Sequence, residues 1–174
     1  LDIIMPQHPQ IYAEKVTEQQ VEQLLQAAVM APSAQNRQPW HFIVCDDKTL
    51  FQQFQQIHPY SKMLDEAPLL IVVCGDTQQQ AGPQFYLEDC AAATENILLA
   101  AHALGLGACW LGLPPNSERQ AQVQQLFRMP EHIKPFCGIA LGVPANSRRG
   151  QKESWMDLST KIFGSLRQCL RQGG

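Results

Sequence analysis

The loop from Ala31 to Trp40 holds the polar groups best suited to bind a small ligand. It follows a predicted helix, precedes a predicted strand and contains the hydroxyl of Ser33 and the amide of Asn36 between two prolines. Such a loop can present side-chain and backbone hydrogen-bonding atoms to a ligand. The same loop could instead only end the helix, with Asn36 bonding the backbone. Taken alone, the loop leaves both interpretations open.

Cysteine, histidine and glycine offer no second site of this kind. The six cysteines occur singly, without a C-x-x-C pair, and the histidines do not cluster. Four of the cysteines lie inside apolar runs, so we expect buried, reduced thiols and neither a metal site nor a disulfide framework. The run Gly105-Leu106-Gly107 follows a predicted helix, whereas a dinucleotide-binding glycine motif must follow a strand and open a helix.

The elements that must position the loop alternate between helix and strand. Helices are predicted over 17–30, 46–59, 89–104 and 117–127, and strands over 40–45, 69–74, 108–111 and 136–143. Thr17 with Gln20, and Ser117 with Gln120, form capping-box patterns at two helix starts. Gly105 stands where a helix commonly ends in a left-handed residue. The alternation predicts an α/β class.

Three apolar stretches indicate where the core lies. The continuous run 69–74 suits a central strand covered on both faces, and 40–45 is predicted to be a short buried strand. The stretch 89–104 is apolar almost all round, which is typical of a long buried helix. Beyond Asp157, apolar residues at helical spacing predict a tail that packs on this subunit or on a partner; they are Leu158, Ile162, Phe163 and Leu166.

The composition is that of one globular domain. The chain has 174 residues, a net charge of -3 and scattered basic residues, apart from the pair Arg148 and Arg149. This charge argues against broad nucleic-acid binding. The apolar stretches are too short or too interrupted to cross a bilayer, and the first residues lack the features of a secretion signal. We therefore expect a single domain over 1–174 in the cytoplasm, with no nucleic-acid or membrane partner.

Five motifs in chain order resemble the nitroreductase family. The segment 31–40 resembles its A-P-S-x-x-N-x-Q-P-W element, which an apolar strand follows. The other four are Glu66-Ala67-Pro68, the run 95–107 with the sequence ENILLAAHALGLG, Cys109-Trp110-Leu111-Gly112 and Leu141-Gly142-Val143-Pro144-Ala145. The resemblance covers nearly the whole chain from about Tyr12 onward.

The resemblance implies both a fold and an activity. The fold is a nitroreductase-like domain of the α/β (α+β) class. Helices wrap a mixed sheet, and one long central helix is buried. The domain forms a homodimer with FMN at the subunit interface. The implied activity passes electrons from NADH or NADPH to a nitroaromatic, a quinone or a similar small acceptor by a ping-pong mechanism. FMN carries the redox chemistry, so no catalytic side chain and no metal is expected.

The same resemblance implies which residues contact the flavin ring. Pro32, Ser33 and Ala34 line it with backbone groups, and the Asn36 amide bonds the ribityl chain or the ring edge. Trp110, Leu111 and Gly112 lie against the reactive face, where a backbone N–H could donate to the flavin N5. For the Trp110 side chain, packing in a core strand is an equally good explanation.

The phosphate end departs from the family pattern. Lys152 best matches the family's basic residue, with Arg149 and Arg148 as neighbours. The usual N-terminal R-R-S-x-R motif is missing, and Gln7, His8 and Gln10 stand at those positions. Each lost charge-assisted hydrogen bond could cost about 1.5–3 kcal/mol.

Three functions therefore remain open from the sequence. The first is an active flavoenzyme whose phosphate site is built differently. In it, a protonated His8 could restore part of the lost positive charge, or His8 could be only an exposed turn residue. The second is a dimeric scaffold or binding protein that has lost stable flavin binding. The third is a flavin-fragmenting or dehalogenating enzyme of the same superfamily.

Overall fold

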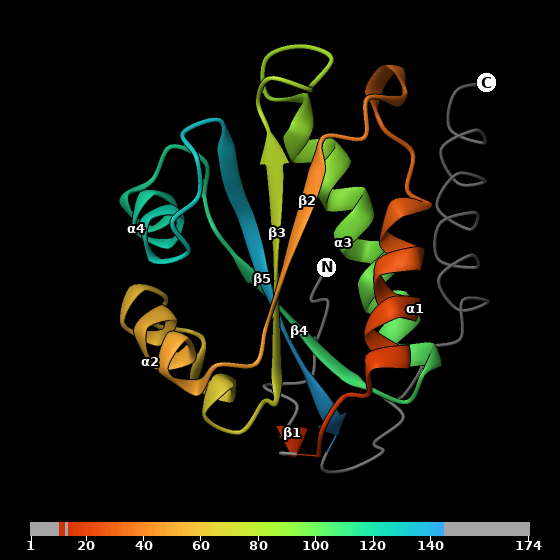
Figure 1. Ribbon diagram of the computed structural model, residues 1–174, viewed down its shortest axis with the longest axis vertical. Coiled ribbons are helices and arrows are strands. Elements are labelled where there is room, and N and C mark those ends of the chain that lie inside the picture. Colours follow the sequence, from red (N-terminus) through yellow and green to blue (C-terminus); the bar gives the residue numbers. More distant parts are fainter. Residues whose placement is uncertain (1–10, 13, 145–174) are drawn as a thin grey trace, which may run out of the picture.

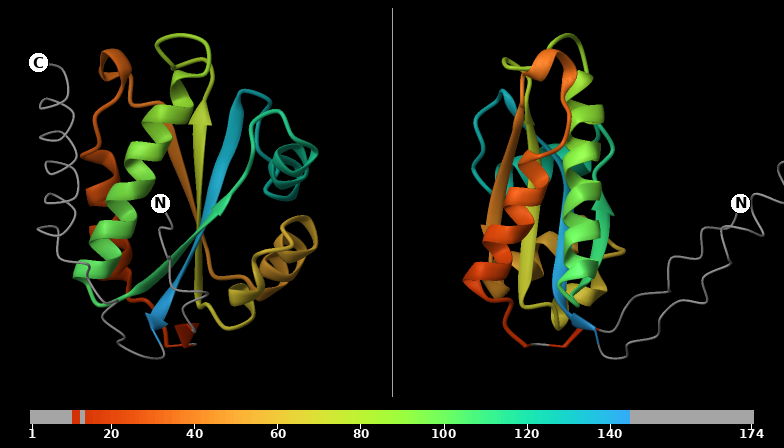
Figure 2. Two further views of the ribbon diagram at one scale, coloured as in Figure 1. Left: turned by 180° about the vertical axis from the view of Figure 1, so that it is seen from behind. Right: turned by 90° about the vertical axis from the view of Figure 1, so that its right-hand side faces the viewer.

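A computed structural model describes residues 11, 12 and 14–144. A sheet lies between two helix layers (Figures 1 and 2). Helices α1 (Glu18–Val29) and α3 (Phe85–Ala103) cover one face of the sheet, and α2 (Lys48–Ile57) and α4 (Glu118–Leu126) cover the other. Two short 3-10 helices, η1 (Ala34–Asn36) and η2 (Lys62–Asp65), lie in the connections. The α/β (α+β) class is thereby confirmed.

The sheet is built around its last strand. β5 (Ile133–Pro144) pairs with β3 (Leu69–Asp76), β4 (Gly107–Gly112) and β1 (Ile11–Tyr12), and β2 (Trp40–Cys45) pairs with β3. Every one of these pairs is antiparallel, so the mixed sheet is not seen within the described residues. β3 and β4 do run in the same direction, but β5 lies between them and pairs antiparallel with both.

Strand β3 is buried along its whole length, as its continuous apolar run predicts. Ile71 and Val73 pack into the cluster under α1 and α3, while Leu70 and Val72 pack into the cluster under α2 and α4. This alternation follows from the two-residue repeat of a strand. Because both faces are covered by helices, the sheet is a firm support for the loops at its edges.

The prediction of a buried strand at 40–45 is wrong. β2 pairs only with β3, so it is an edge strand among the described residues. Its end residues Trp40 and Cys45 are buried, but His41 is exposed and Val44 is 43% exposed. The short apolar run reflects partial burial against both helix layers, with Phe42 half-buried under α1 and α3 and Ile43 half-buried under α2 and α4.

Helix α3 is longer than predicted, and within one protomer it is buried along one side. It begins at Phe85 after the left-handed residue Gln84, four residues before the predicted start at Asp89. Ile97 and Ala101 lie in the core, whereas Leu99 is 61% exposed. The helix is therefore buried on the side that faces the sheet, and part of its apolar surface is open in one protomer.

The residues predicted to cap the ends of helices do so in the structure. Thr17 and Gln20 form a complete capping box at α1, and Ser117 accepts a hydrogen bond from Gln120 N–H at the start of α4. Asp47 caps α2, and Gly105 takes a φ of +74° after α3. These signals are local, which is why the sequence shows them directly.

Candidate functional site

The loop predicted to line a flavin has an unusual backbone. Pro32 and Asn36 are exposed, and Ser33 and Ala34 are half-buried. Gln35, Asn36 and Gln38 have φ values of +52°, +54° and +50°. Residues other than glycine rarely adopt this left-handed conformation, which costs of the order of 1–2 kcal/mol per residue. The loop must therefore be held in place by its surroundings.

Among the hydrogen bonds that hold the loop, three tie it to α3, to itself and to β3. The Ala34 N–H donates to Asp89 Oδ1 at 2.8 Å, which ties the loop to helix α3. The Gln38 N–H donates to Ser33 Oγ at 2.9 Å and closes the loop on itself. At the far end, the Pro39 C=O accepts from the N–H of Asp76, the last residue of β3, at 2.7 Å. The predicted binding residues Ser33 and Ala34 thus sit in a fixed framework.

The sequence interpretation missed Asp89. This carboxylate is only 5% exposed, and its second oxygen, Oδ2, has no hydrogen-bond partner among the described residues. A buried polar atom without a partner is rare enough to require an explanation. The signal was present in the sequence, since Asp89 and its neighbour Glu88 stand at the head of an apolar stretch.

The second predicted element, β4, presents its backbone in a defined way. The Leu113 N–H donates to Phe136 C=O at 3.1 Å, so these two residues form a hydrogen-bonded pair. In an antiparallel ladder such pairs alternate, so Leu111 also bonds β5 while the N–H and C=O of Gly112 point away from it. Of the predicted residues, Trp110 and Gly112 therefore have the backbone N–H turned away from β5, and Leu111 does not.

His58 holds the outward side of Gly112 and was also missed by the sequence interpretation. Its Nε2 donates to the Gly112 carbonyl at 3.1 Å, and because a carbonyl can only accept, Nε2 must carry the proton. The residue is 4% exposed, and its Nδ1 has no partner among the described residues. Burial lowers the pKa of His58, the bond to Gly112 opposes that shift, and Arg119 adds to it. His58 is therefore neutral near pH 7.

The Trp110 side chain has a packing role. Its ring meets that of Phe136 edge to face, with centroids 5.7 Å apart, and it is half-buried against the cluster under α1 and α3. Leu111, by contrast, is 2% exposed and packs into the cluster under α2 and α4. The side chains of β4 thus anchor the strand on both faces of the sheet.

The two elements do not meet within one protomer. The loop leads into β2, while β4 lies at the opposite edge with β3 and β5 between them (Figure 1). Neighbouring strands are about 4.8 Å apart, so three spacings separate the two edges by roughly 14 Å. A single flat ligand that touches both elements would need one of them from a second copy of the chain.

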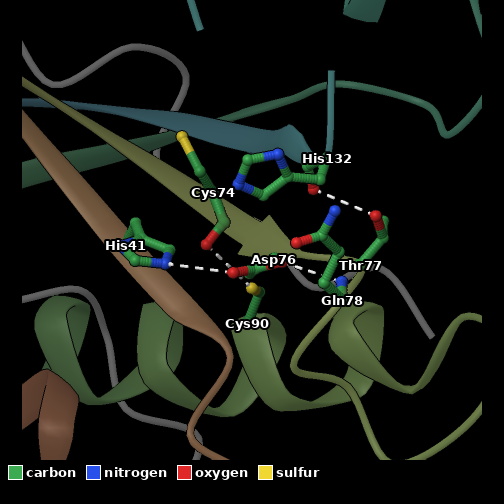
Figure 3. A network of polar contacts seen from close by, with 7 residues as sticks. All are labelled: His41, Cys74, Asp76, Thr77, Gln78, Cys90 and His132. Atoms are coloured by element: carbon green, nitrogen blue, oxygen red, sulfur yellow. Dashed lines mark hydrogen bonds and ion pairs between the residues drawn. The ribbon is translucent and has the colours of Figure 1, made fainter. Parts of the chain in front are cut away.

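A polar network supports the end of β3 beside the loop (Figure 3). Asp76 accepts from the Gln78 N–H at 2.8 Å and lies 3.8 Å from His41 Nε2, and the Cys90 thiol donates to Cys74 C=O. Burial raises the pKa of Cys74 to about 12 and that of Cys90 further. These thiols therefore stay protonated and serve packing.

Other chemistry receives no support from the described part of the chain. Cys137 is also buried, with a pKa raised by desolvation to about 12. Within residues 14–144 no three His, Cys, Asp or Glu side chains come together as a metal site would require. No described helix is long and apolar enough to cross a bilayer.

The groups present fit a flavin at the ring end. A flavin ring needs a firm slot with backbone donors and acceptors, which the held loop and the outward N–H of Gly112 can supply. The predicted phosphate residues all lie outside the described residues; they are Gln7, His8, Gln10, Arg149 and Lys152. Their role stays a prediction.

The structure is an α/β domain in which one sheet lies between two helix layers, and the two elements predicted to contact a ligand stand at opposite edges of that sheet. The model of the Nitroreductase family matches residues 12–143, and the chain belongs to this family. A protein of Methanothermobacter thermautotrophicus named "Putative NADH dehydrogenase/NAD(P)H nitroreductase" is 43% identical over 133 residues, which are 76% of this chain and 70% of that protein.

Solved structures agree with this assignment. An FMN-dependent nitroreductase from Clostridium difficile R20291 has a TM-score of 0.77 and 28% identity, covering 88% of this chain and 90% of its own. A structure from Desulfovibrio desulfuricans, described as a "putative nitroreductase in complex with fmn", has a TM-score of 0.70 and 29% identity, covering 87% and 90%.

Proposed function

We propose that the protein is an FMN-dependent oxidoreductase that takes electrons from NADH or NADPH and passes them to a nitroaromatic, a quinone or a similar small acceptor. Membership of the Nitroreductase family and the FMN-bound relative support the cofactor. The observation that carries the proposal is the strained loop at 33–38, which belongs to the family's motif and is held by a hydrogen bond within it and by another to Asp89. Stored strain of this kind is typical of ligand-binding sites.

The arrangement of the two elements supports a homodimer with FMN at the interface. The loop of one protomer and β4 of its partner could contact the same flavin, whereas those of one protomer lie at opposite sheet edges. Apolar side chains stand exposed on the helix layer of α1 and α3, among them Met30 at 80% and Leu99 at 61%. A second copy would cover such surface. The cysteine thiols of the described residues are free and mostly buried, which supports a place in the cytoplasm. We propose one domain over 1–174.

Each residue has a defined task in this proposal. FMN, when bound, supplies the electron transfer between the two substrates. Pro32, Ser33 and Ala34 hold the ring through backbone groups, and Asn36 adds an amide. Gly112 offers its N–H to the flavin, and no side chain acts as acid or base.

The phosphate end has its own proposal. Lys152, with Arg149 beside it, would carry the phosphate charge, and Gln7, His8 and Gln10 would add neutral or weakly charged contacts. Exposed charge pairs are screened within about 8–10 Å at physiological ionic strength. FMN affinity should therefore fall steeply with salt, whereas riboflavin affinity should not.

Purified protein tests the proposal directly. We expect flavin absorption, FMN among the ligands released for mass spectrometry, a dimer by light scattering, and parallel lines in two-substrate kinetics with NADH or NADPH. Changing Lys152 to Gln should weaken FMN in isothermal titration far more than riboflavin. If the protein binds neither flavin, the proposal fails and the scaffold function is favoured.

A further inference from the structure

We infer that Asp89 is the positioning residue of the flavin-lining loop, acting from helix α3 through the Ala34 N–H. The inference rests on the proposed function for the purpose of the loop. It concerns a residue that is 55 positions away in sequence and outside the loop motif. Asp89 does not itself belong to the predicted flavin-contacting set.

The bond controls the conformation of the loop because of where it falls. Ala34 is the first residue of η1, and its N–H belongs to the peptide group that also carries the Ser33 carbonyl. That carbonyl accepts from the Asn36 N–H at 3.0 Å. By holding this one peptide group, Asp89 fixes the first turn of the loop, immediately before the left-handed residues Gln35 and Asn36.

Stability alone does not explain Asp89. Burying a carboxylate is unfavourable unless its oxygens are paired, and only one of the two oxygens has a partner in the described structure. A residue retained for stability would be expected to satisfy both. A half-paired carboxylate bonded to a strained loop is better explained by what it does for the loop.

Two substitutions of Asp89 separate the possible roles. Asp89→Leu removes the acceptor at similar size, whereas Asp89→Asn keeps an oxygen for the Ala34 N–H. Lys48→Met is the matched control, because the Lys48 ammonium holds the loop at 64–67 through backbone carbonyls on the other face of the sheet. For each variant and the unaltered protein, we would measure FMN affinity by titration, the melting temperature of the flavin-free protein, and amide hydrogen exchange at 33–38.

The positioning role makes a distinctive set of predictions. Asp89→Leu should weaken FMN binding by about tenfold or more and speed exchange at 33–38. The flavin-free protein should melt at the same temperature as the unaltered one or higher, because an incompletely paired charge has gone. Asp89→Asn should restore FMN affinity to within about threefold. Lys48→Met should lower the melting temperature and leave FMN affinity unchanged.

Other outcomes overturn the inference. If Asp89→Leu binds FMN as the unaltered protein does, Asp89 does not position the site. If both Asp89 variants lower the melting temperature and exchange rises throughout the protein, the role is only structural. If the unaltered protein binds no FMN but exchange at 33–38 rises selectively in Asp89→Leu, the proposed function fails while the hold of Asp89 on the loop stands.

Discussion

The two predicted flavin-contacting elements are held in opposite ways. Strand β4 is regular, and the antiparallel ladder with β5 already sets the direction of each of its N–H and C=O groups. The loop at 33–38 is irregular and strained, so side chains must hold what a ladder cannot. A buried anion, Asp89, anchors the loop, and a neutral imidazole, His58, anchors the strand. The regular strand β4 therefore needs one side-chain hydrogen bond beside its ladder, whereas the irregular loop needs several hydrogen bonds.

Both anchoring side chains, Asp89 and His58, leave one polar atom without a hydrogen bond. Asp89 Oδ2 and His58 Nδ1 are two of the three buried side-chain atoms without a partner in the described residues, the third being Gln80 Oε1. Such atoms usually reduce stability. Two of the three belong to side chains that bond the elements predicted to contact a flavin.

The largest expected effect is on the free energy of unfolding, and it distinguishes strand β4 from the loop at 33–38. Leu111→Ala should lower the free energy of unfolding by about 2–5 kcal/mol, because it opens a cavity under α2 and α4 where Leu111 is 2% exposed. Pro32→Ala, in the exposed part of the loop, should change it by less than about 1 kcal/mol. Urea denaturation of the two variants measures the difference; equal losses would show that the loop is part of the folding core.

A change in the loop should instead act on binding. Asn36→Gly removes the amide but keeps a residue that accepts the φ of +54°, so FMN should bind about tenfold more weakly with little change in the stability of the flavin-free protein. Asn116→Gly is the matched control, since Asn116 has a φ of +56° outside both elements. Titration with FMN would contradict the assigned role of Asn36 if the two variants behaved alike.

His58, the anchor of β4, predicts a pH dependence of stability. Because burial lowers the pKa of His58, the unfolded chain, with a histidine pKa of about 6.5, binds the proton more readily than the folded one. Stability should therefore be fully present above about pH 6.5 and should be lost as the pH falls toward the lowered folded pKa. Denaturation at several pH values gives stability as a function of pH. The acid limb of that curve, where stability falls with falling pH, should be flatter for His58→Gln than for the unaltered protein.

A matched substitution controls for general acid effects. His102→Gln replaces an exposed histidine at the end of α3 and should leave the acid limb as it is in the unaltered protein. If His102→Gln flattens the limb as much as His58→Gln does, the buried imidazole is not its source.

The smallest effect concerns strain in the loop itself. Gln35→Gly should change the free energy of unfolding by less than about 0.5 kcal/mol, because relief at a φ of +52° is offset by greater freedom of the unfolded chain. FMN affinity should fall a few-fold as the loop loosens. Arg128→Gly, at a φ of +51° before β5, should leave FMN affinity unchanged. A tighter-binding Gln35→Gly would mean that the strain opposes binding.

Local signals explain how much of the fold was predictable. The capping box at Thr17, the N-cap at Ser117, the left-handed Gly105 and the apolar run of β3 depend on residues close together in the chain, and each is confirmed. The second half of the predicted box at Ser117 does not form, because the Gln120 side chain accepts from the Asn116 N–H. The family motif at 31–40 likewise predicted the family correctly. The burial of β2 was predicted wrongly, because burial depends on neighbours that local patterns do not reveal.

The sequence by itself therefore determined the elements, the family and the residues predicted to contact a flavin. Only the tertiary structure decided which strands are neighbours, that β5 separates β3 from β4, and that the two predicted elements stand at opposite edges. It also decided that Asp89 reaches Ala34 and His58 reaches Gly112, across 55 and 54 residues. The physical reason is that a hydrogen bond depends on distance in space, and contacts this far apart in the chain follow from how whole layers pack.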